Sequence, residues 1–225
     1  PVEPPGRFLL AKRGRFAEAA PMPASNRWTY FLLAAVLAVL VWSGIGPKDR
    51  MTWWLEVTPA LLGLAALALT DRRFRFTPLL QTLIALHMIL LAVGGHYTYA
   101  EVPLGHWMAQ AFHLSRNHYD RLGHFAQGLV PALIAREVVL RRGLIPSRGW
   151  VGFFVVCTAL AISAVYELAE WVAAEIYGKN ADAFLGGQGD IWDTQKDMAC
   201  ALVGALCAVI LFSRWHDRQL AKAQR

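Results

Sequence analysis

Acidic and histidine side chains recur at the ends of hydrophobic segments in this 225-residue chain. They are Asp120 and His124 at the start of one segment, Glu167 and Glu170 at the end of the next, and Asp193 and Asp197 at the start of the last. Charged groups at membrane depth cost free energy, so they are default candidates for function. Carboxylates together with an imidazole suit a divalent cation such as Mg, Mn or Zn. The residue types therefore predict a polar site that can bind a metal.

Helical spacing places these side chains on common faces. Asp120, His124 and Gln127 follow one another at intervals of four and three residues, which puts them on one side of a helix. Two further pairs lie one helical turn apart, namely Glu167 with Glu170 and Asp193 with Asp197. We expect these faces to meet, and we take all six acidic and histidine residues as candidate metal ligands.

Carboxylates that converge in a low-dielectric site must bind a cation, share protons or pair with basic groups. If the site is catalytic, a bound metal would polarise a phosphoryl or carbonyl oxygen, and His124 or Glu167 would handle the proton. Asp120, His124 and Glu167 are therefore the candidate catalytic residues. No motif in the chain specifies a reaction, so the sequence leaves open whether the protein is an enzyme.

Simpler interpretations exist for each residue alone. Asp120 and Asp193 precede helical patterns, where Asp is a favoured N-cap. Acids near helix ends can also reach the lipid headgroups. His87 lies alone in mid-membrane, where a hydrogen-bonded packing histidine is expected. A joint site is favoured because so many ionisable groups share one depth: Asp120, His124, Glu167, Glu170 and Asp197.

Long apolar segments must position these residues. Hydrophobic residues make up 56% of the chain, and crossing a hydrocarbon core of about 30 Å takes about 20 of them in succession. Uninterrupted apolar runs favour helices over the alternating pattern of a membrane β-barrel. We predict an all-α, polytopic membrane bundle with about six transmembrane helices, at residues 28–46, 53–70, 77–95, 120–140, 150–172 and 193–213.

The remaining segments complete the predicted organisation. Residues 96–119 mix aromatic and polar side chains, which predicts an outer loop with an amphipathic interfacial helix around Val102 to Leu114. The chain then divides into an N-terminal tail, 1–27, one membrane-embedded domain, 28–215, and a C-terminal tail, 216–225. Most of the 22 Lys and Arg residues fall on the same side of the membrane as the two tails, which predicts that both termini are cytoplasmic. The net charge of +6 then reflects membrane orientation, and the expected partner is the lipid bilayer, not nucleic acid.

Three blocks carry a family resemblance: YDRLGHFAQG at 119–128, AVYELAEW at 164–171 and GDIWDTQKDMACALVGA at 189–205. With these blocks the chain resembles the YjdF-like inner membrane proteins from about residue 28 to residue 215. The resemblance implies a multi-pass protein of the cell inner membrane. It brings no biochemical activity with it.

More distantly, the same blocks are similar to VanZ-like membrane proteins. The pattern positions that match are Asp120, His124, Glu167, Asp197 and Gly204. The chain departs from the pattern where Glu170 replaces Gln, where Ala201 replaces Asn, and where an Arg before the last Asp is missing. VanZ-like proteins are associated with glycopeptide-antibiotic tolerance and the cell envelope, so this resemblance implies an envelope role.

Three classes of function follow. The leading hypothesis is an inner-membrane protein with an outward-facing acidic and histidine site that can bind a divalent metal and acts on an envelope or lipid-linked substrate. The second is an ion- or proton-coupled transporter, although the polar groups cluster on one side and the chain shows no inverted repeat. The third is a structural membrane protein without catalysis.

Overall fold

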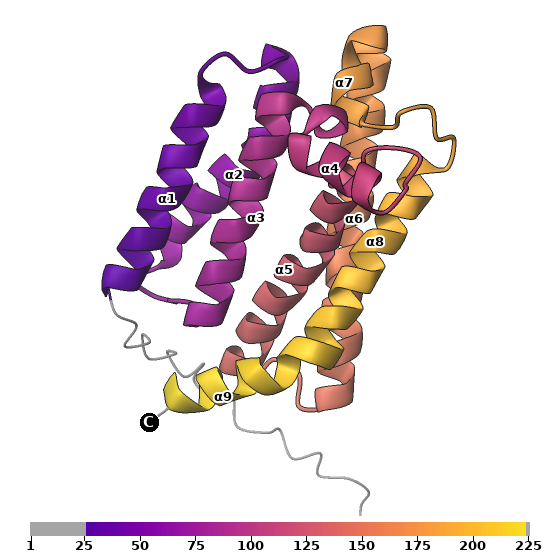
Figure 1. Ribbon diagram of the computed structural model, residues 1–225. Helices are drawn as coiled ribbons and strands as arrows, with labels where there is room; N and C mark the ends of the chain where they lie inside the picture. The colour runs from indigo at the N-terminus through magenta and orange to yellow at the C-terminus, as the bar shows by residue number, and fades with distance from the viewer. Residues whose placement is uncertain (1–25, 224–225) are drawn as a thin grey trace, which may run out of the picture.

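The computed structural model describes residues 26–223, without the side chains of Asn26, Lys179, Asn180, Asp182 and Ala223. Within this range every regular element is a helix (Figure 1). The long helices are α1 (Asn26–Gly44), α2 (Arg50–Thr70), α3 (Pro78–Tyr97), α5 (Tyr119–Arg142), α6 (Arg148–Tyr177) and α8 (Asp193–Cys207). The short elements are η1 (Tyr99–Glu101), α4 (Pro103–Ala111), η2 (Gly178–Ala181), α7 (Asp182–Leu185), the π-helical turn η3 (Ala208–Phe212) and α9 (Ser213–Ala223).

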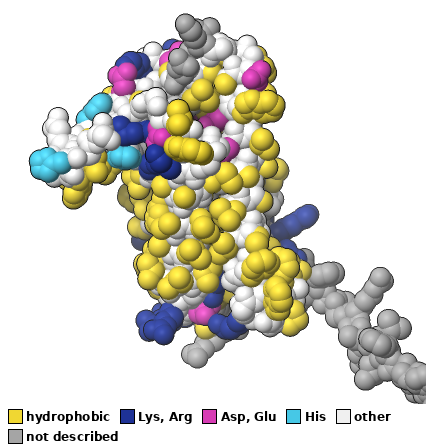
Figure 2. Space-filling view, turned by 90° about the vertical axis from the view of Figure 1, so that its right-hand side faces the viewer, with side chains coloured by type: hydrophobic (Ala, Val, Ile, Leu, Met, Phe, Trp, Pro, Cys, Tyr) yellow, Lys and Arg dark blue, Asp and Glu magenta, His cyan; other side chains and the backbone are white. Residues whose placement is uncertain are grey.

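These helices confirm the predicted all-α membrane bundle. Among the described residues, five helices are long and apolar enough to cross a membrane: Arg27–Gly44, Arg50–Thr70, Pro78–Tyr97, Arg148–Tyr177 and Asp193–Lys222. Hydrophobic side chains cover the middle of the face shown in Figure 2, and charged side chains gather at its two ends. This distribution is that of a protein whose middle lies in hydrocarbon and whose ends lie near water.

Helix α5 is the polar member of the bundle and lies at its centre. Its 24 residues would span about 36 Å, enough to cross a bilayer. It packs against α3, α6 and α8, so its ionisable side chains are shielded from lipid. Asn117 Oδ1 accepts a hydrogen bond from the backbone N–H of Tyr119 at the helix start, and Gly143 ends the helix in a left-handed conformation, with φ of 61°.

Helices α5 and α8 touch backbone to backbone. A Cβ added at Gly128 on α5 would overlap the carbonyl oxygen of Ala201 on α8, and one at Gly204 on α8 would overlap that of Phe125 on α5. Ala201, Ala205 and Ala208 are fully buried along the same contact. The small residues of α8 thus allow its backbone to approach that of α5 closely, as small residues commonly do between membrane helices.

The two ends of the bundle differ. One end, here called the site end, carries η1, α4, η2, α7 and the loop before α8 (Figure 1). Helix α4 lies where the amphipathic helix is predicted, and exposes Leu104 and Trp107, while Phe112 just after it is also exposed. The other end, here called the terminal end, carries the start of α1 and all of α9 (Figure 1).

A buried polar network holds the terminal end together. Glu137 accepts hydrogen bonds from the backbone N–H of Thr77, from Arg141 and from His216 Nε2. Arg136 donates to His216 Nδ1 at 3.1 Å. The network explains why helix α9 continues through residue 216, where the sequence analysis places the start of a tail. Residues 1–25 and 224–225, which hold nearly all of the predicted N-terminal tail and the last two residues of the predicted C-terminal tail, lie outside the described residues.

Replacing Gly128 with Ala should destabilise the protein. The added methyl group would push α5 and α8 apart, and overpacking of this kind costs about 1–3 kcal/mol. Thermal unfolding in detergent measures the effect. Gly149→Ala on α6 is the matched control, because its Cβ would meet nothing closer than Ser147 Oγ at 3.9 Å. An equal unfolding temperature for the two variants would contradict the close contact.

Candidate functional site

Three side chains from α5 and α8 converge at the site end. Asp120, His124 and Asp197 each offer a metal-ligating atom, and these atoms all lie within 4.8 Å of one another. The three residues are buried, with exposed fractions of 7%, 5% and 2%. The cluster exists because α5 and α8 approach so closely one turn below it, at Gly128 and Ala201.

The hydrogen bond of His124 determines which ring nitrogen faces the carboxylates. His124 Nδ1 lies 3.0 Å from Gln127 Oε1. An amide oxygen can only accept, so with this oxygen facing the ring Nδ1 is protonated and donates a hydrogen bond to Gln127. In the neutral ring, Nε2 is then an acceptor, and it lies 3.5 Å from Asp120 Oδ1. Two acceptors face each other across this gap, which a cation or a further proton would stabilise.

Glu167 on α6 completes the inner wall of the cluster. Its Oε1 atom lies 3.6 Å from His124 Nδ1. Within the described part of the chain, Asp120 Oδ2, Glu167 Oε1 and Asp197 Oδ1 are buried and accept no hydrogen bond of good geometry. Leaving such an atom unpaired costs about 1–3 kcal/mol, more for a charged group. The described residues therefore leave these acceptors of Asp120 and Glu167 without a donor.

Basic residues pair with the acids nearest the surface of the site end. Arg121 NH2 contacts Asp193 Oδ1 at 2.7 Å and Asp190 Oδ2 at 3.2 Å. Arg116 NH1 contacts Asp193 Oδ1 at 2.9 Å, and Lys196 contacts Asp190 at 2.6 Å. The sequence indicates Arg116 and Arg121 as basic residues near the acids but not which acids they contact, because Asp190 and Asp193 belong to a distant segment, around the start of α8.

Arg121 also reaches the buried cluster. Its Nε atom lies 2.7 Å from Asp197 Oδ1, although neither atom has a hydrogen bond of good geometry. Asp197 thus contacts Arg121 and also belongs to the cluster with Asp120 and His124. Its pairing with Arg121 compensates part of its negative charge, while Asp120 and Glu167 have no arginine or lysine in salt-bridge contact among the described residues.

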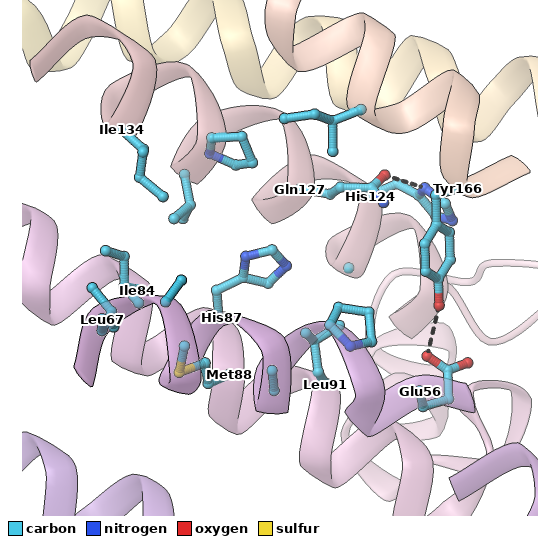
Figure 3. Close-up of a pocket in the computed structure, with 18 of the residues that line it drawn as sticks. Glu56, Leu67, Ile84, His87, Met88, Leu91, His124, Gln127, Ile134 and Tyr166 are labelled. Carbon is cyan, nitrogen blue, oxygen red and sulfur yellow. Dashed lines mark hydrogen bonds between the residues drawn. The ribbon is translucent and has the colours of Figure 1, made fainter. Parts of the chain in front are cut away.

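A second group of polar residues lies beside the cluster, on the wall of a cavity. Tyr166 on α6 donates a hydrogen bond to Glu56 Oε2 on α2 at 3.2 Å (Figure 3). Glu170, also on α6, lines the same cavity together with Asp120 and His124. Glu56 is buried, with 3% of its surface exposed.

The six residues singled out from the sequence therefore have different surroundings. Asp120, His124 and Asp197 form the cluster, Glu167 adjoins it, and Glu170 lies on the cavity wall. Asp193 is engaged by Arg116 and Arg121. The capping interpretation is wrong for both aspartates concerned, because His118 is the N-cap of α5 and Trp192 is the N-cap of α8.

The family model described as a predicted membrane protein (DUF2238) matches residues 28–218. The chain belongs to this family. Inner membrane protein YjdF of Escherichia coli (strain K12) is 55% identical over 184 residues, which cover 82% of this chain and 88% of that protein. No solved structure matches the chain.

These findings confirm the resemblance to YjdF-like proteins and an integral, multi-pass protein of the inner membrane. They name no substrate and no reaction. The orientation of the termini and the similarity to VanZ-like proteins stay predictions. All three sequence blocks that carry the resemblance contribute to the site end: the first holds Asp120 and His124, the second Glu167, and the third Asp197.

The contacts of Asp190 with Lys196, Arg121 and the backbone of Trp192 should make the stability of the protein depend on pH. The bond from Lys196, followed by the backbone N–H of Trp192 and by Arg121, lowers the pKa of Asp190 from 3.8 to about 2. Because the unfolded chain takes up this proton more readily, the contribution of Asp190 to stability is complete above the unfolded pKa and is lost as the pH falls towards 2.

Thermal unfolding of the wild type and Asp190→Asn tests this expectation. The wild type should unfold at the higher temperature near pH 5, and the difference should shrink between about pH 4 and pH 2. Lys48 and Glu101 form a separate ion pair at the site end, so Glu101→Gln serves as a control for a general effect of removing a carboxylate. A difference for Asp190→Asn that stays constant down to pH 2 would contradict the pairing.

Proposed function

We propose that Asp120, His124 and Asp197 bind a divalent cation such as Mg, Mn or Zn, and that the protein uses this site on an envelope or lipid-linked substrate. The observation that carries the proposal is the convergence of three buried ligand atoms within 4.8 Å. Carboxylates and a neutral imidazole are the ligands that these cations take in proteins.

The orientation of His124 supports the metal. Ligating histidines usually donate their other ring N–H to an acceptor, which fixes the ring and its tautomer. Gln127 Oε1 supplies that acceptor at 3.0 Å. The unprotonated Nε2 then faces Asp120 Oδ1, and both atoms are available to one cation.

The charge balance supports the same conclusion. Arg116, Arg121 and Lys196 are engaged by Asp190 and Asp193, with Asp197 sharing Arg121. Among the described residues, the basic group in salt-bridge range of Asp120 and of Glu167 is His124. Negative charge in a low-dielectric site must be compensated, and a divalent cation would do so without altering the fold.

The chemistry proposed is polarisation of an oxygen followed by proton transfer. A bound divalent cation would polarise a phosphoryl or carbonyl oxygen of the substrate. Glu167 is the candidate proton acceptor, because its free Oε1 atom lies at the edge of the cluster, 3.6 Å from His124 Nδ1. Asp120 Oδ1 lies 3.5 Å from His124 Nε2 on the opposite edge of the ring, where both atoms would ligate the cation.

An ion path is the rival to this proposal. The cavity beside the cluster continues towards the terminal end, but among the described residues that line this deeper part none is acidic. Glu137, the buried acid of the terminal end, is satisfied by Thr77, Arg141 and His216. This distribution favours chemistry at one end over a relay of carboxylates across the bundle.

Metal binding by the purified protein tests the proposal. Equilibrium dialysis against Mn²⁺ and Zn²⁺ should give about one cation per chain, because the cluster offers one set of ligands. Asp197→Asn and His124→Ala should each weaken the affinity by at least about 10–100-fold, the loss seen even for residues that only support a ligand. Both variants should remain folded in detergent.

Glu175→Gln is the matched control, because Glu175 lies on α6 near the site end but is exposed. It should bind metal like the wild type. A wild type that binds no divalent cation above the level of Asp197→Asn would refute the metal part of the proposal. Proton or cation flux into liposomes, abolished by Glu167→Gln, would instead support the transporter.

A further inference from the structure

An elongated cavity leads away from the cluster into the bundle. It lies among α2, α3, α5 and α6 and has a volume of about 380 Å³, within the range of about 300–1,000 Å³ that ligand pockets occupy. Polar side chains gather at one end, where Glu56, Asp120, His124 and Glu170 line it. The rest of the wall is mostly apolar and includes Leu67, Ile84, Met88 and Ile134 (Figure 3).

The cavity is long and runs along helix α2. Glu56 and Thr70 both line it, and they lie on the same helix at positions that differ by about 21 Å in rise. This length is about two thirds of the hydrocarbon core of a bilayer. Its shape therefore suits an extended chain more than a compact solute.

The deeper part of the cavity reaches the surface that faces lipid. Ala66 and Thr70 on α2 and Ile162 on α6 line the cavity and are also exposed on the outside of the bundle. A hydrocarbon chain could therefore enter sideways from the bilayer, between α2 and α6, without crossing water.

Two polar groups in the wall point to a ligand. Asp120 is buried and its Oδ2 atom has no hydrogen-bond partner. His87 faces the cavity from α3 (Figure 3), and among the described residues no hydrogen bond to its ring is present. An unsatisfied polar group in an apolar wall costs free energy, which a ligand with polar atoms near its head would recover.

We propose that this cavity binds the hydrocarbon chain of a single-chain lipid phosphate, with the phosphate at the cluster of Asp120, His124 and Asp197. The inference deepens the proposed function and rests on it for the head group, because an acidic site needs its cation to attract a phosphate. The tail lies between α3 and α5, and His87 hydrogen-bonds an oxygen atom close to the head.

Other classes of ligand fit the walls less well. Water and small polar solutes would find few partners along the deeper part, and apolar cavities stay dry. A peptide would carry backbone groups that need hydrogen bonds at membrane depth. A hydrocarbon chain needs neither, and its burial in the protein costs little because it leaves a similarly apolar bilayer.

Photolabelling in lipid nanodiscs tests the proposal. The probe is hexadecyl phosphate with a diazirine at the end of the chain remote from the phosphate, in discs of phosphatidylcholine. Labelled residues are located by mass spectrometry of peptides. We expect the label on the deeper cavity wall, around Leu67 and Ile134, and we expect unlabelled hexadecyl phosphate to compete it away.

Two isoleucine variants make the result specific. Ile134→Trp fills the cavity and should remove most of the labelling, because the larger side chain occupies the space that the hydrocarbon chain needs. Ile210→Trp is the matched control, because Ile210 is 68% exposed on the outside of the bundle, and it should label like the wild type. Labelling spread evenly over lipid-facing residues, without competition by the unlabelled probe, would overturn the cavity proposal.

The same samples separate this inference from the proposed function. If the protein binds no metal but labels the cavity competitively, the metal proposal fails and the chain-binding site stands. If metal binds as proposed but the cavity is not labelled, the chain-binding inference alone fails. The corresponding alcohol, with the same diazirine, tests the head group: labelling as strong as that with the phosphate would contradict a phosphate-binding site.

Discussion

The candidate site depends on the close contact between helices α5 and α8. Gly128 and Gly204 each lie against a backbone carbonyl of the other helix, so any larger side chain at these positions would separate the pair. That contact brings Asp197 within reach of Asp120 and His124. Because both helices present their polar faces to each other, the ionisable groups are kept away from lipid at the centre of the bundle.

The buried acids at the two ends of the bundle differ in how completely they are paired with basic groups. At the terminal end, Glu137 is satisfied by Arg141, His216 and Thr77, which makes this network a structural anchor for α9. At the site end, the arginines engage Asp190 and Asp193 nearer the surface, and the deeper carboxylates keep free oxygen atoms. A protein that needed these acids only for stability would be expected to pair them. Among the described residues, Asp120 and Glu167 have no arginine or lysine in salt-bridge contact, and this difference from Glu137 is a basis of the proposed binding site.

Features that depend on one helix could be predicted from the sequence, whereas contacts that depend on how several helices pack together could not. Hydrophobic length predicts the spanning helices, and spacing predicts that Asp120 and His124 share a face. The rotation of one helix relative to another depends on the packing of both, so the sequence of neither helix alone predicts the pairing of Arg121 with Asp193 and Asp197. The continuation of α9 beyond residue 216 depends on the burial of His216 against Glu137. The cavity lined by His87 arises from four helices together, and no local pattern indicates it.

The central claim is that His124 and the two aspartates share one cation, and pulsed electron paramagnetic resonance of the Mn²⁺-loaded protein tests it most directly. Nitrogen modulation from a directly bound imidazole should appear in the wild type and disappear in His124→Ala, whereas His87→Leu should retain it. A Mn²⁺ spectrum without histidine nitrogen coupling in the wild type, or one unchanged in His124→Ala, would show that any bound cation lies elsewhere and would contradict the account.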